Sequence, residues 1–293
     1  MSRPVVRLPI GYAEVRSPAA CWIARHECVE EIQRGEADRL LLGRVERRRG
    51  AGGGRGVLLR MRLGGGEAIG KRAQHGGLIG PLFRGLYAGT LRIRAQLVAA
   101  DRLERAGVTT PPVLAVGWRR VLGPLHAHAI ITGAVRDAQN LYEVARANAP
   151  WRRRRVALEK SADLIRTMHD VGFLHADLNV TNILFGHGAN GDRVQIVDLD
   201  GGTFHDQIGS RGRFRNLARL LRSYEKWIAG RFRLSVREEL IFLRRYCRND
   251  RVLLRRLQRA LQSHRSRLGL HRAGWLVSGA SSAQRRPDRP RVE

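Results

Sequence analysis

The residues best suited to chemistry lie between His175 and Leu184, in the run His-Ala-Asp-Leu-Asn-Val-Thr-Asn-Ile-Leu. Asp177 offers a carboxylate that could orient a hydroxyl group and accept its proton, and Asn182 offers an amide oxygen to a metal ion. Kinases place these two groups on one loop, in the pattern H-x-D-L-x-x-x-N. The spacing therefore predicts phosphoryl transfer, with Asp177 as the base and Asn182 as a metal ligand. The alternative is a solvated loop in which Asp and Asn cap a helix.

A second acidic motif follows downstream. Asp198 comes directly after the strand-like run Gln-Ile-Val and begins the triplet Asp-Leu-Asp, at the place of the D-F-G element of kinases. A carboxylate at a strand end is a hard oxygen ligand suited to Mg²⁺. Asp198 is therefore predicted as a metal ligand, with ATP and Mg²⁺ as the cofactors. For Asp200 two interpretations stay open: an acid near the substrate or metal, or a turn residue.

The N-terminal half contains a candidate phosphate-binding region. Gly54 and Gly56 end a glycine-rich stretch, and glycine lets backbone N–H groups approach a phosphate closely. A predicted hairpin over residues 57–71 follows, with Lys71 on its second strand. Lys71 is one of only three lysines and is expected to bind the phosphates of ATP. The alternatives are a flexible loop and a surface lysine.

Hydrophobic periodicity supplies the elements that must position these residues. Apolar residues recur at helical steps over 90–106 and again over 151–171, and each stretch ends at a glycine. Further strands are expected at 113–116 and 127–131, and short extended segments at 183–185 and 194–197. The order is strand-rich and then helix-rich.

This order predicts an α+β class with a protein-kinase-like fold of two lobes. The first lobe would be a mainly antiparallel sheet with one helix, the second mainly helical, with the ligand between them. The expected divisions are an N-terminal extension (1–45), the nucleotide-binding lobe (46–132), the catalytic lobe (133–277) and a disordered tail (278–293).

Composition limits the protein's class without naming a partner. The formal charge is +28 and nearly all basic residues are arginine. Arginine favours an anionic partner, but a bias that replaces lysine on solvated faces explains the charge equally well. The three cysteines are too scattered for a disulfide framework. No signal peptide or bilayer-spanning run is evident, so the expected location is cytoplasmic.

Together these stretches resemble the bacterial lipopolysaccharide-core sugar kinases, and most closely the 3-deoxy-D-manno-octulosonic acid (Kdo) kinases. The resemblance covers roughly residues 50–230, and its helix motif Asn-Leu-x-Arg-Leu-x-Arg-Ser is more specific than the catalytic loop. The matching stretches are 54–56, 71–80, 107–112, 131–132, 175–184, 198–200 and 216–223.

The resemblance implies a phosphotransferase with an alcohol acceptor, which uses ATP and Mg²⁺ to phosphorylate a Kdo hydroxyl, the 4-OH, of Kdo-lipid A. It implies peripheral association with the cytoplasmic side of the inner membrane, and no nucleic-acid partner. Asp177 would be the base, Asn182 and Asp198 the metal ligands, and Lys71 the phosphate ligand. Backbone groups of Thr132, Gly133 and Val135 would contact adenine. The arginines of 152–155 and 211–222 would attract the anionic acceptor.

The sequence departs from the family pattern at two places. Gln96 stands where a helix should offer a glutamate to Lys71, so that either Glu67 or Glu104 replaces it or the lysine is held loosely. The segment after Thr132 lacks the acid that the family tends to have. A heptose kinase or another small-molecule kinase on the same scaffold remains an alternative, as does an inactive kinase-like protein that binds anions.

Overall fold

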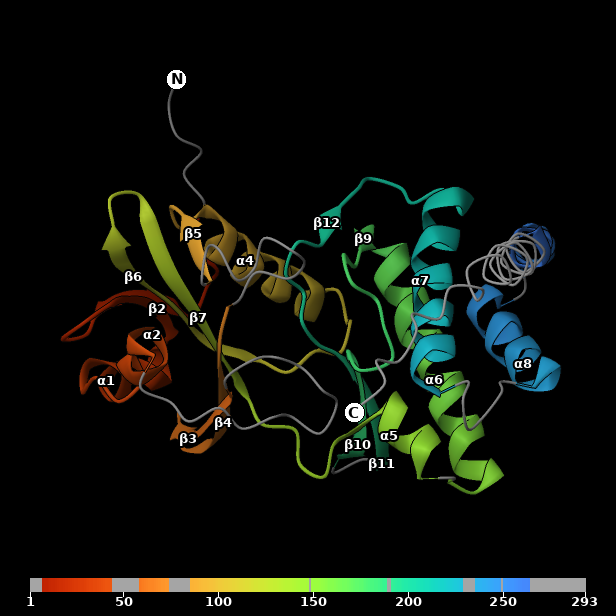
Figure 1. The fold of residues 1–293 in the computed structure, drawn as a ribbon, viewed down its shortest axis with the longest axis horizontal. Helices are drawn as coiled ribbons and strands as arrows, with labels where there is room; N and C mark the ends of the chain where they lie inside the picture. The colour runs from red at the N-terminus through yellow and green to blue at the C-terminus, as the bar shows by residue number, and fades with distance from the viewer. Residues whose placement is uncertain are drawn as a thin grey trace, which may run out of the picture. The chain divides into compact units, whose positions relative to one another are not determined.

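The computed structural model of the protein describes residues 7–43, 58–73, 85–147, 149–188, 191–228, 235–248 and 250–263 (Figure 1). The chain divides into two compact units, residues 1–246 and residues 247–293. Within the described part of the second unit, residues 251–263 are helical. All candidate site residues belong to the first unit.

An antiparallel sheet of seven strands forms the N-terminal half (Figure 1). Its strands run in the order β1-β2-β6-β7-β4-β3, and β5 pairs with β7. Helix α4 packs against β6 and β7. The elements are β1 (Tyr12–Arg16), β2 (Cys21–Arg25), β3 (Leu58–Leu63), β4 (Gly66–Arg72), β5 (Leu86–Ala88), α4 (Leu91–Arg105), β6 (Val113–Leu122) and β7 (Leu125–Gly133).

The segment expected as an N-terminal extension is instead part of this sheet. Strand β2 pairs with β6, and Trp22 of β2 is fully buried. Gly117 of β6 makes room for that ring, because a Cβ there would lie 2.3 Å from an indole carbon. The short helices η1 (His26–Cys28), α1 (Val29–Gln33) and α2 (Asp38–Leu42) follow, so the sheet half has more than the one helix predicted. The division expected at residue 45 is wrong, because these elements share the buried core of the sheet.

Helices dominate the rest of the first unit, with three short antiparallel pairings beside them (Figure 1). Strand β10 pairs with both β8 and β11, and β9 pairs with β12. The elements are β8 (Gln139–Asn140), α5 (Leu141–Arg146), α6 (Trp151–Asp170), β9 (Phe173–Leu174), β10 (Ile183–Gly188), β11 (Gly191–Ile196), β12 (Thr203–Phe204), α7 (Ser210–Ile228) and α8 (Val236–Cys247).

A glycine makes the turn that leads from α6 into the catalytic loop. Gly172 has φ +84°, a conformation that side chains rarely adopt, and a Cβ at this position would lie 2.0 Å from the carbonyl oxygen of His205. The His205 N–H also donates to the Gly172 carbonyl at 2.8 Å. This close approach fixes where β9 begins, and the loop that carries Asp177 follows it.

The structure confirms the α+β class and the order of a strand-rich and then a helix-rich half. The hairpin predicted over 57–71 is β3 and β4, and the two predicted helices are α4 and α6. The tail expected to be disordered, 278–293, lies outside the described residues. In the described part of the chain, no helix has the length and apolar character needed to cross a bilayer.

Candidate active site

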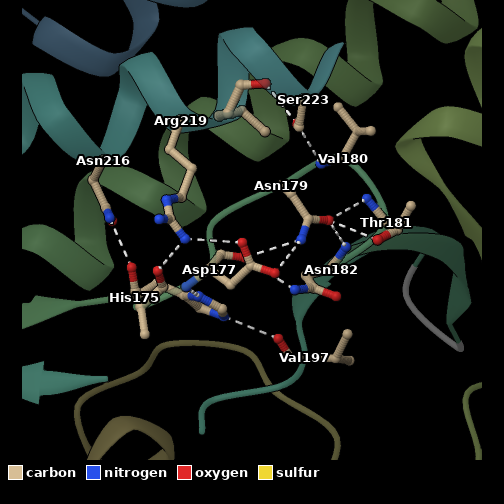
Figure 2. Close-up of polar contacts among 12 residues, drawn as sticks. His175, Asp177, Asn179, Val180, Thr181, Asn182, Val197, Asn216, Arg219 and Ser223 are labelled. Carbon is tan, nitrogen blue, oxygen red and sulfur yellow. Dashed lines mark hydrogen bonds and ion pairs between the residues drawn. The ribbon is translucent and has the colours of Figure 1, made fainter. Parts of the chain in front are cut away.

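Hydrogen bonds join the loop that carries Asp177 and Asn182 to Val197, the residue directly before Asp198 (Figure 2). The Asn182 side-chain amide donates to the Asp177 carbonyl at 3.0 Å. The Val197 N–H, adjacent to Asp198, donates to the Asn182 carbonyl at 2.9 Å. The structure therefore brings the backbone of Asp177, Asn182 and Asp198 together, as their predicted roles require.

His175 is a buried connector between the catalytic loop and the strand that ends before Asp198. Its Nδ1 accepts the Asp177 N–H at 3.0 Å, so the ring proton is on Nε2, which donates to the Val197 carbonyl at 3.0 Å. Burial lowers the pKa of His175, which keeps the ring neutral and this pattern of donors intact. His175 thus positions both acidic segments.

Both oxygens of the Asp177 carboxylate have partners. Asn179 donates to Oδ2 at 2.9 Å, and Arg219 donates to Oδ1 at 3.0 Å (Figure 2). The Asn179 side-chain oxygen in turn accepts from the Thr181 N–H and hydroxyl and from the Asn182 N–H. Such bonds fix the rotamer of the predicted base and tighten the loop around it.

One face of α7 supports this loop. Asn216 donates to the His175 carbonyl at 2.7 Å, Arg219 contacts Asp177, and the Ser223 hydroxyl accepts the Val180 N–H at 3.0 Å. The three residues are spaced i, i+3 and i+7, which places them along one side of a helix. The sequence predicted a role for Arg219 only as one of the arginines of 211–222, and none for Asn216 or Ser223, although their helical spacing was a usable signal.

Asp198 occupies a strained position and pairs with Lys71. Its φ of +61° is left-handed, which is uncommon for a residue other than glycine. The Lys71 ammonium lies 3.0 Å from Asp198 Oδ2. The partner of Lys71 is thus neither of the glutamates considered. Glu104 pairs with Arg25 at 3.1 Å, and Glu67 lies four residues from Lys71 along an extended strand, about 13 Å away.

Asp200 is a turn residue, which is one of the two interpretations left open for it. It lies in a turn closed by the Gly202 N–H and the Leu199 carbonyl, and its carboxylate binds Arg92 at the start of α4. Arg92 donates from Nε at 2.8 Å and from Nη2 at 2.6 Å, a bidentate pair. The Asp-Leu-Asp segment is therefore tied to β4 through Asp198 and to α4 through Asp200.

The predicted nucleotide-binding residues have different outcomes. Gly54, Gly56 and residues 74–80 of the matched stretch 71–80 lie outside the described residues. Thr132 and Gly133 end β7. The Gly133 N–H donates to the Pro112 carbonyl and the Ala134 N–H to the Glu67 carbonyl. The Gly133 N–H is therefore engaged within the protein, and the contacts of Thr132, Gly133 and Val135 with adenine remain predictions.

The oxygen atoms at the site suit a magnesium ion that is carried in with a nucleotide. The described residues contain no cluster of three or more His, Cys, Asp or Glu that could hold a metal by itself. Mg²⁺ at nucleotide sites uses one or two protein oxygens and completes its shell with phosphates and water. Asn182 uses its NH₂ group on the loop, and Lys71 contacts Asp198 through Oδ2. The Oδ1 atoms of Asn182 and Asp198 accept no hydrogen bond from the described residues, so both are available as metal ligands.

These features are typical of a phosphotransferase of the kinase-like class: a predicted base on an H-x-D-L-x-x-x-N loop, an acid after a strand, and a lysine in the N-terminal sheet. The family model described as "Lipopolysaccharide kinase (Kdo/WaaP) family" matches residues 46–246. The chain therefore belongs to this family.

Several characterised proteins are similar to this chain. The 3-deoxy-D-manno-octulosonic acid kinase of Haemophilus influenzae (strain PittEE) is 30% identical over 173 residues, which cover 56% of this chain and 68% of that protein. The kinase of the same name from Xanthomonas campestris pv. campestris (strain B100) is 31% identical over 179 residues, which cover 58% and 67%. A solved structure of WaaP in complex with acyl carrier protein is 22% identical, covers 78% of this chain and 96% of that chain, and has a TM-score of 0.49.

Proposed function

We propose that this protein transfers the γ-phosphoryl group of ATP to a hydroxyl group, the 4-OH, of Kdo in Kdo-lipid A. The observation that supports the proposal is that hydrogen bonds join Asp177 to Asn182 and Asn182 to Val197, the residue directly before Asp198. The acceptor in this proposal is taken from the relatives named 3-deoxy-D-manno-octulosonic acid kinase, and the type of reaction is taken from the family.

In this proposal Asp177 orients the acceptor hydroxyl and receives its proton as the phosphorus–oxygen bond forms. Asn179 and Arg219 hold the carboxylate in one orientation, so that little rearrangement is needed when the acceptor binds. Both partners donate hydrogen bonds to the ionised form, which is the form that can act as a base.

Lys71 and Asp198 form the nucleotide side of the site. Mg²⁺ bound with ATP would be held by Asn182 and Asp198 and would neutralise charge on the phosphate oxygens. Lys71 would contact the phosphates, a short movement from its present place 3.0 Å from Asp198. The strained φ of Asp198 suits a residue whose orientation is set by function.

The acceptor is the part of the proposal most open to direct test. The purified protein is incubated with ATP and Mg²⁺ in two separate reactions. One contains Kdo-lipid A and the other contains a heptose-containing core acceptor. Mass spectrometry and NMR of the products then locate the phosphate. Phosphate on the Kdo 4-OH supports the proposal, whereas transfer to heptose alone would reassign the acceptor. Binding of anions without transfer to any acceptor would indicate an inactive kinase-like protein.

A further inference from the structure

Three acids of the candidate site each pair with a different cation, and these cations are not equally engaged. Asp198 pairs with Lys71, Asp200 with Arg92 and Asp177 with Arg219. Lys71 has a predicted role toward ATP. Arg92 already uses Nε and Nη2 on Asp200, and its guanidinium also covers the Tyr87 ring at 4.9 Å.

Toward the residues that the structure describes, Arg219 uses one of its three nitrogens. Nη1 donates both to the Ala176 carbonyl at 2.6 Å and to Asp177 Oδ1 at 3.0 Å (Figure 2). Nε and Nη2 donate to no described residue, and the side chain is 47% exposed. These are the same two nitrogens with which Arg92 binds a carboxylate in this structure. Arg219 therefore presents an unused bidentate edge beside the predicted base.

This edge lies where an anionic acceptor needs a cation. A hydroxyl oriented by Asp177 brings the rest of the acceptor close to that carboxylate, and a second carboxylate there would be repelled. A planar arginine that already contacts Asp177 can bind the incoming carboxylate and offset the repulsion. Its position is set by α7, whose Asn216 and Ser223 are bonded to the same loop.

We infer that Arg219 is a specificity-determining residue, which binds the acceptor's carboxylate through Nε and Nη2 while Asp177 orients the neighbouring hydroxyl. The inference rests on the proposed function, since it assumes an acidic sugar as the acceptor. It assigns Arg219 a contact with substrate in addition to its contact with the base.

The test compares Kdo-lipid A with its Kdo methyl ester, which keeps the hydroxyl groups and lacks the negative charge. The value of kcat/KM is measured for both acceptors with the wild-type protein and with Arg219→Gln. We expect the wild type to prefer the free acid by about 10- to 100-fold, because charge-assisted hydrogen bonds are strong. Arg219→Gln should reduce this preference to about threefold or less, with the KM for ATP nearly unchanged.

A role limited to positioning Asp177 gives a different result. Arg219→Gln would then slow transfer to both acceptors by the same factor and leave the acid-to-ester ratio at its wild-type value, which would overturn the inference. The charge control is Arg244→Gln, which removes an exposed arginine of α8 and should keep the wild-type ratio. Loss of the preference in this control would also overturn it, since diffuse charge would then be the cause. If the wild type phosphorylates neither acceptor, the proposed function fails, and the inference with it.

Discussion

At the residue scale, the site depends on side chains that hold other groups in place. His175 donates to the Val197 carbonyl, Asn179 to Asp177 and Asn216 to the His175 carbonyl. His169 extends this support into the core of the helical half. Its Nε2 lies 3.1 Å from Asn216 Oδ1, and its Nδ1 lies 2.7 Å from the Tyr246 hydroxyl. Because Asn216 donates its NH₂ group to His175, its oxygen must accept from His169.

This buried histidine predicts how stability depends on pH. Burial lowers the pKa of His169 to about 4, whereas the unfolded chain has a value near 6.5. Below 6.5 the unfolded chain gains a proton that the folded chain does not, so stability falls as the pH decreases from about 6.5 to 4. The contribution of His169 amounts to about 2 kcal/mol between pH 7 and pH 5.

Urea denaturation at pH 7 and pH 5 measures this effect in the wild type and in His169→Gln. The variant should lose less stability than the wild type over the same interval, whatever its stability at pH 7. An identical loss in both proteins would show that His169 does not titrate as described. His175, whose pKa is also lowered by burial, remains in both and serves as an internal control.

The sequence indicated which residues could do the chemistry but not which residues support them. Asp177 and Asn182 share one loop, so that their spacing carries the signal. Asp177 and Arg219 are 42 residues apart, and only the docking of α7 brings them together. The Lys71–Asp198 pair spans 127 residues, and its two members were assigned to different ligands. Their predicted catalytic roles remain predictions.

At the element scale, the start of α4 is connected to the Asp-Leu-Asp turn by Arg92 and Asp200. Gln96 on the same helix supplies no countercharge to Lys71, which pairs with Asp198. The bidentate Arg92–Asp200 pair is thus a charged connection between the helix and the Asp-Leu-Asp segment. We infer that it positions this segment, as a helix glutamate and the lysine do in other kinases.

We therefore expect Arg92→Ala or Asp200→Asn to lower kcat/KM for ATP by about 10- to 100-fold, because Asp198 loses a fixed neighbour. Exchanging the two residues, Arg92→Asp with Asp200→Arg, should recover part of the loss. The matched control is the Asp101–Arg105 pair on the same helix. Arg105→Ala should change kcat/KM for ATP by less than about threefold. Equal effects at the two pairs would argue that only helix stability is involved.

Strands and helices with strong periodicity were predicted well, and the N-terminal elements were not. Strands β1 (YAEVR) and β2 (CWIAR) do not alternate strictly between apolar and polar residues. Their assignment depends on β6, about 90 residues downstream, with which β2 pairs and against which Trp22 packs. Long-range pairing of this kind is not readable from local composition. The family match begins at residue 46, so β1 and β2 add to the sheet outside the matched region.

At the scale of the whole molecule, the formal charge is +28, and some arginines are paired within the protein whereas others are exposed to a partner. The arginines of 152–155 are largely engaged: Arg153 binds Gln139, Arg154 pairs with Glu238 and Arg155 pairs with Glu159. Helix α7 instead exposes Arg211, Arg215 and Arg222 on the helix that supports the catalytic loop. The face that attracts an anionic membrane is therefore expected on α7.

This assignment predicts the lipid dependence of membrane binding. At low salt the protein should bind vesicles that contain anionic lipid and not neutral ones, as measured by flotation. Replacing Arg211, Arg215 and Arg222 with Gln should weaken that binding about 100-fold, since each arginine contributes about 1 kcal/mol near such a surface. The same change at the exposed residues Arg39, Arg60 and Arg62 is the control. Equal affinity for neutral vesicles would contradict peripheral electrostatic association.

The most direct test of the central claim is single-turnover phosphoryl transfer by Asp177→Asn. The asparagine keeps an oxygen for Arg219 and cannot accept the hydroxyl proton. We predict that transfer slows by about 10³-fold or more, while the affinity for ATP and the thermal unfolding midpoint stay close to wild type. Transfer within tenfold of the wild-type rate would contradict the assignment of Asp177 as the base, and with it the account of this site.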